Sequence, residues 1–187
     1  ILMRDVVIEY FFDITRAFSE LLSLPLQLSY GLFDKGFTFG SGETAVAIPP
    51  LSWVGVVATM AIIGHAYGGW RLALIGGLGF LYLAIFGQWS SAMRTMAMIV
   101  ITVPLGVIIG LLVGILGYRR PGLNKAVIVP LLDIAQAMPQ YAYLVPILML
   151  FGNNPVSAMI ATLAFAVPPM VRVTTLALGQ VPGEIQD

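Results

Sequence analysis

The stretch from Thr95 to Gly117 contains no charged residue and is apolar at most positions. A helix that crosses the hydrocarbon core of a bilayer needs about 20 predominantly apolar residues. Hydrophobic residues make up 59% of the chain and charged residues 10%, whereas about a quarter of a soluble domain is charged. We therefore expect an all-α, polytopic helical membrane protein. About five spans are predicted, at residues 51–67, 72–87, 95–117, 126–151 and 156–171.

Basic residues predict how these spans are oriented, because Lys and Arg collect in cytoplasmic loops. The alternate loops contain Arg94 and the uncharged turn GNNP at 152–155. The tail from Arg172 is thus predicted inside, and residues 1–50 outside. The basic residues on the predicted inner side are Arg71, Arg119, Arg120, Lys125 and Arg172.

The N-terminal segment has a different pattern, with charged residues spaced three or four apart. This spacing places them on one face of a helix over the first 24 residues. We expect an amphipathic helix that lies in the membrane interface; the alternative is a transmembrane helix cut at its start. Residues 34–50 are predicted to be a loop, and we expect both chain ends to be internal to a longer protein. The charged residues are Asp5, Glu9, Asp13, Arg16 and Glu20.

Few residues are available for catalysis. The chain has no cysteine, a single histidine (His65) and a formal net charge of zero, so we expect no metal site and no binding to nucleic acid. The phosphate-loop pattern GxxxxGK[ST] and the GxSxG elbow are both absent. Asp133 is the one acid inside a predicted span. It is either a proton or cation site, or a carboxylate near the cytoplasmic interface that pairs with a basic group. His65 is interpreted mainly as a packing residue.

The fourth predicted span combines helix breakers with polar side chains. Pro139 and Pro146 each leave a backbone carbonyl without its usual partner, and in a bilayer such groups need protein or water. Gln136 and Gln140 are four residues apart, so one face is expected to hold both, with Tyr143 along that side. A kinked, polar face suits a solute pathway, and Pro168-Pro169 in the fifth span is expected to repeat the device. The alternative is that the prolines only shape the helix bundle.

Two segments resemble a known family. LLDIAQAMPQYAYLVPILMLFG at 131–152 and IATLAFAVPPMVRVTTLALGQVPGEIQD at 160–187 are similar to the permease subunit of glycine betaine/proline-type ABC importers. The shared features are Leu-Asp-x-x-Gln-x-x-Pro, Tyr-Leu-x-Pro-x-x-Met-Leu-Phe-Gly, Pro-Pro-x-x-Arg and Gln-Val-Pro. The resemblance covers 126–187 most closely, and GNNPVS at 152–157 departs from it.

The resemblance implies a transmembrane permease domain over 51–171 in the inner membrane of a bacterium. Two permease copies would surround one path, an external binding protein would deliver a compatible solute, and cytoplasmic ATPase subunits would hydrolyse ATP. No cofactor is expected in this chain. From the residues of the fourth predicted span, pathway contacts are expected from Gln136, Pro139, Gln140, Tyr141, Tyr143 and Pro146. Contacts to the ATPase are expected from Leu178, Gln180, Val181, Pro182, Glu184, Ile185 and Asp187, in the segment 172–187.

Two other functions stay open at this point. One is a secondary transporter or channel that uses Asp133 and His65 for ion coupling; the other is a purely structural membrane subunit. A path free of fixed charge would suit a zwitterion such as glycine betaine or proline, and would also accept choline, carnitine or trimethylamine N-oxide.

Overall fold

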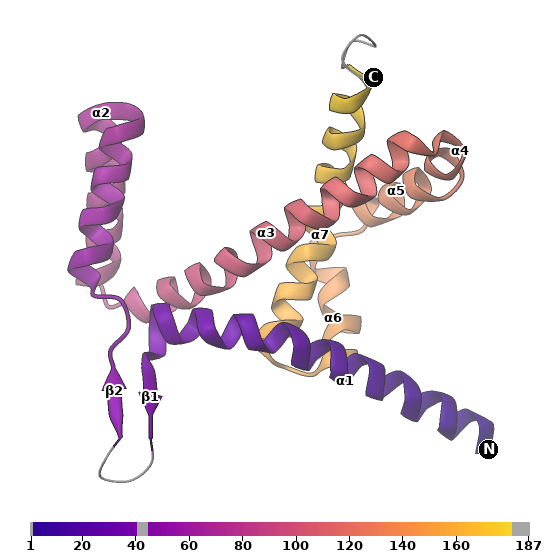
Figure 1. Ribbon diagram of the computed structural model, residues 1–187, viewed down its shortest axis with the longest axis horizontal. Helices are drawn as coiled ribbons and strands as arrows, with labels where there is room; N and C mark the ends of the chain where they lie inside the picture. The colour runs from indigo at the N-terminus through magenta and orange to yellow at the C-terminus, as the bar shows by residue number, and fades with distance from the viewer. Residues whose placement is uncertain (1, 41–44, 181–187) are drawn as a thin grey trace. The chain divides into compact units, whose positions relative to one another are not determined.

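The computed structural model describes residues 2–40 and 45–180, with side chains from Asp13 onward except those of Ile14 and Gln140. The described chain is almost entirely helical (Figure 1). This confirms the all-α prediction, apart from two three-residue strands. In chain order the elements are α1 (Leu2–Tyr30), the π-helical turn η1 (Gly31–Lys35), β1 (Phe37–Phe39), β2 (Val46–Ile48), α2 (Trp53–Ile85), α3 (Trp89–Arg119), α4 (Pro121–Leu123), the π-helical turn η3 (Asn124–Ile128), α5 (Val129–Ala137), α6 (Gln140–Phe151) and α7 (Pro155–Gly179).

Three of the described helices, α2, α3 and α7, are long and apolar enough to cross a membrane. A fourth crossing is added if the bent pair formed by 121–137 and 141–151 is counted as one span. The chain is therefore a multi-pass membrane protein, while the predicted number of about five spans is not confirmed. The chain forms two compact units, residues 24–100 and residues 1–23 with 101–187, which are described separately.

In the unit 24–100, α2 is broken in the middle and folds back on itself. Gly68 and Gly69 leave helical geometry, and Gly69 has a φ of 64°, a conformation that glycine adopts without strain. The two arms then pack side by side (Figure 1): a Cβ added at Gly64 would lie 2.6 Å from the carbonyl oxygen of Leu72. The break lies between the predicted spans 51–67 and 72–87, whose status as separate crossings stays a prediction.

The same unit contains an ion pair that joins η1 to the start of α3. The Asp34 carboxylate accepts from the Ser90 hydroxyl at 2.6 Å and from the Arg94 Nε at 2.8 Å. These hydrogen bonds lower the pKa of Asp34 below its usual value, and the one from Ser90 has the largest effect. Asp34 and Arg94 are therefore on the same side of the membrane, and their location outside stays a prediction.

Residues 34–50 are not simply the predicted loop. Phe37 pairs with Ile48 and Phe39 with Val46 in an antiparallel two-stranded hairpin. Aromatic and β-branched residues favour strands, and both kinds occur in these two strands. The loop prediction missed the short strands, and residues 41–44 between them lie outside the described residues.

In the unit that contains residues 101–187, small residues bring α3 close to α7. A Cβ added at Gly110 would collide with Met170 of α7, and one added at Gly114 would collide with Thr174. The Thr175 hydroxyl also donates to the Gly114 carbonyl at 3.3 Å. Glycine spacing of four therefore serves helix packing within the chain here.

An apolar cluster then holds α5 against α7. Ile128, Leu132 and Val171 are buried together, and Val113, Leu123 and Val167 pack around them. The cluster contacts the middle of α7, directly before the predicted coupling segment 172–187.

Candidate translocation site

The predicted fourth span is not one kinked helix but two helices separated by a sharp break. α5 ends at Ala137, Met138 is extended with a ψ of 138°, and Pro139 precedes the first residue of α6. The helical segments 121–137 and 141–151 are bent by 103° relative to each other. Proline explains the break, because its ring disfavours helical geometry in the residue before it and it lacks an N–H for the helix.

This break corrects one inference from the sequence. Gln136 lies in the last turn of α5, and Gln140 is the first residue of α6. They therefore do not share one face of a continuous helix, as their spacing of four had suggested. The other predicted pathway residues stay close to the break or follow it along α6, and their role in transport stays a prediction.

The side chains near the break differ in exposure. Gln136 is exposed, and Tyr141 in the first turn of α6 is 81% exposed. Tyr143 is half-buried, and its hydroxyl is buried without a hydrogen-bond partner among the described residues. A buried hydroxyl without a partner is costly, so Tyr143 offers a polar group for a solute, water or another chain. Pro146 lies inside α6 without interrupting it.

Asp133 is paired with a basic residue rather than free. Its carboxylate accepts from the Arg172 guanidinium of α7, which confirms the interpretation that it forms an ion pair. The partner is not Lys125, which is closer in sequence. His65 also has a packing contact, since its ring lies 5.0 Å from the ring of Trp70 between centroids.

The fifth predicted span is longer than expected and is not interrupted. α7 continues to Gly179 and runs without a break through Pro168 and Pro169, so these prolines do not repeat the device seen at Pro139. The predicted coupling residues fall into two groups, those that the structure describes and those that it does not. Leu178 lies in the last turn of α7 and Gln180 caps it. The remaining ones, Val181, Pro182, Glu184, Ile185 and Asp187, lie outside the described residues.

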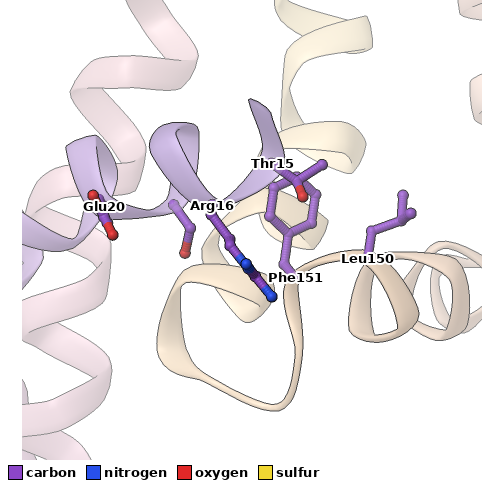
Figure 2. A pocket seen from close by; sticks show the side chains of 6 residues that line it. Thr15, Arg16, Glu20, Leu150 and Phe151 are labelled. Carbon is purple, nitrogen blue, oxygen red and sulfur yellow. The ribbon is translucent and has the colours of Figure 1, made fainter. Parts of the chain in front are cut away.

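A small cavity lies where α1 approaches the end of α6. Its volume is about 240 Å³, and α1 contributes most of its lining while α6 contributes Leu150 and Phe151 (Figure 2). The Phe18 and Phe151 rings lie 6.3 Å apart between centroids. The lining includes one basic side chain and one acidic side chain. The lining residues from α1 are Thr15, Arg16, Ser19 and Glu20.

Sequence reasoning placed Arg16 and Glu20 on a charged helix face but did not connect that face with α6. The spacing of charges along α1 identified the face, and only the three-dimensional fold identified its neighbour. Asp133 was expected to pair with a basic group, but Arg172 was not identified as that partner, because the two residues are 39 positions apart.

No family model matches the chain, but curated proteins do. The permease protein TmoV of the trimethylamine N-oxide transport system of Pelagibacter ubique is 39% identical over 178 residues, which cover 92% of this chain and 25% of TmoV. ProW of the glycine betaine/proline betaine transport system of Escherichia coli is 37% identical over 137 residues, covering 71% of this chain and 38% of ProW.

OpuAB of the glycine betaine transport system of Bacillus subtilis is 31% identical over 166 residues, covering 86% of this chain and 58% of OpuAB. The chain thus spans between a quarter and just over half of the length of these relatives. These matches extend well beyond the motifs in which the resemblance was recognised. They confirm that resemblance: the chain is a homologue of the permease subunits of glycine betaine and trimethylamine N-oxide transport systems.

Proposed function

We propose that the chain is part of the membrane-spanning permease subunit of an ATP-driven importer for a compatible solute. The substrate class is glycine betaine, proline or a related quaternary amine or N-oxide. The observation that carries the proposal is the alignment with named permease proteins over most of the chain. The names of these relatives include both trimethylamine N-oxide and glycine betaine, so the class is proposed and not a single solute.

The partners belong to the proposal as well. Cytoplasmic ATPase subunits would bind the segment 172–187, an extracytoplasmic binding protein would deliver the solute, and a second permease copy would complete the path. ATP would be bound and hydrolysed on the ATPase subunit, and no cofactor is proposed for this chain. The N-terminal segment would lie outside, which the Asp34–Arg94 pair supports by joining η1 to the predicted outer end of α3.

The break between α5 and α6 is the proposed centre of the path. Helix ends expose backbone groups that need polar partners in a membrane, so a break is stable where protein or water surrounds it. Met138 and Pro139 form such a break beside the exposed side chains of Gln136 and Tyr141. The cavity formed by α1 and the end of α6 would lie at the outer mouth of this path.

An ion-coupled carrier is less well supported. Such a carrier needs a carboxylate that is available to the coupling ion, whereas Asp133 is occupied by Arg172. The ring of His65 packs on Trp70.

Uptake by vesicles tests the proposal directly. The full-length permease, reconstituted with its ATPase and binding protein, is expected to accumulate radiolabelled solute only when ATP is supplied on the ATPase side. A sodium or proton gradient without ATP should give no accumulation. Uptake driven by an ion gradient alone would refute the proposal and favour the ion-coupled carrier.

A further inference from the structure

α5 is a short helix with a change of backbone geometry at each end. The π-helical turn η3 precedes it, and the break at Met138–Pro139 follows it. Wider helical turns and breaks often mark places where a chain bends. α5 can therefore change its direction as a unit, and its contacts with other helices decide which direction it takes.

Those contacts are made largely with α7. The buried residues Leu132 and Val171 belong to one apolar cluster, and the next residue after each forms the Asp133–Arg172 ion pair. Apolar packing holds the two helices together without fixing their relative rotation. An ion pair between specific atoms adds that restriction.

The ion pair lies beside the apolar cluster and is not enclosed by it. The Asp133 side chain is 59% exposed and that of Arg172 is 42% exposed. The contribution expected from this pair is geometric, because it fixes which atoms of α5 and α7 meet. α7 runs unbroken from Pro155 to Gly179, so a displacement at its end reaches Arg172 through a continuous helix.

We propose that Asp133 and Arg172 are positioning residues that transmit displacement of the C-terminal end of α7 to α5, and so to the break at Met138–Pro139. This inference rests on the proposed function, in which the ATPase binds the segment 172–187, which includes the last turns of α7. Movement of that segment would turn α5 through the ion pair and change the opening of the path at the break.

The test measures how much solute is transported for each ATP hydrolysed, with the full-length permease, ATPase and binding protein in vesicles. Asp133→Asn and Arg172→Gln are each expected to lower this ratio by about 2- to 30-fold, the range that corresponds to 0.5–2 kcal/mol of coupling. Exchange of the charges, Asp133→Arg combined with Arg172→Asp, should restore most of the loss.

A matched control comes from the ion pair between Asp34 and Arg94. Asp34→Asn breaks the contact with Arg94 in the other compact unit, so it is expected to lower stability while leaving the ratio unchanged. The inference would be overturned if Asp133→Asn and Arg172→Gln both left the ratio of solute transported to ATP hydrolysed unchanged. It would also be overturned if the charge exchange gave a ratio no higher than that of either single variant. Failure of the proposed function is distinguishable, because the unmodified protein would then show no ATP-dependent uptake.

Discussion

Replacement of Gly114 by alanine tests the close packing of α3 and α7. A Cβ at this position would lie 2.6 Å from the Thr174 Cβ and 3.1 Å from the Val171 carbonyl oxygen. Carbon atoms pack best at about 3.5–4.0 Å, so α7 must move away by roughly 1 Å. Overpacking of this kind costs about 1–3 kcal/mol, while alanine gains up to about 1 kcal/mol over glycine in a helix.

Gly79→Ala separates these two effects. Gly79 also lies in a helix, and its added Cβ would meet no atom within 4 Å, so this variant has the gain in helix propensity without the collision. The difference in unfolding free energy between the two variants is therefore the overpacking term alone, about 1–3 kcal/mol. Reversible unfolding in detergent micelles measures it. Equal stability of Gly114→Ala and Gly79→Ala would refute the close contact between α3 and α7.

The remaining predictions concern the Asp34–Arg94 ion pair and the break between α5 and α6. The pKa of Asp34 is lower in the folded protein than in the unfolded chain, where it is about 4. The contact therefore stabilises the fold above about pH 4. This stabilisation is lost as the pH falls through the lower pKa of the folded state. The difference in unfolding temperature between the unmodified protein and Asp34→Asn should therefore be constant from about pH 5 to 8 and shrink below about pH 4; a difference that grows on acidification contradicts this. Pro139→Ala restores a backbone N–H and frees Met138 to become helical, so uptake should fall while membrane insertion stays normal. The loss of uptake should be larger than for Pro146→Ala inside α6. Equal losses of uptake in the two variants would refute a special role for the break. Gln140→Leu is expected to impair uptake while insertion is retained, and normal uptake would remove Gln140 from the path.

The sequence was sufficient for the membrane class and for the positions of the main interruptions. Long uncharged runs predict membrane helices because the bilayer excludes charge, and Gly68-Gly69 and Pro139 act through their own backbone geometry. Local chemistry of this kind can be predicted from the sequence. The size of the bend at Pro139 could not be predicted, because it depends on how α5 and α6 pack after the helix is interrupted.

Contacts between distant residues were beyond the sequence pattern. Asp133 was expected to find a basic partner, but α7 decides that the partner is Arg172 rather than the nearer Lys125. Pro168 and Pro169 look as disruptive as Pro139, yet α7 stays helical through them, and Pro168 is buried in the fold. Packing therefore overrides local preference in α7 and does not do so at the end of α5.

The most direct test of the central claim asks whether solute passes the break between α5 and α6. These 187 residues contain no cysteine, so Gln136→Cys and Tyr141→Cys each place one thiol of this chain beside the break, and Leu112→Cys places one on the exposed apolar surface of α3. In the assembled transporter, a membrane-impermeant thiol reagent is expected to label the first two positions, and saturating solute should slow that labelling. Leu112→Cys should stay unlabelled. Labelling at Gln136→Cys and Tyr141→Cys that is absent, or that proceeds at the same rate with and without solute, would contradict the account.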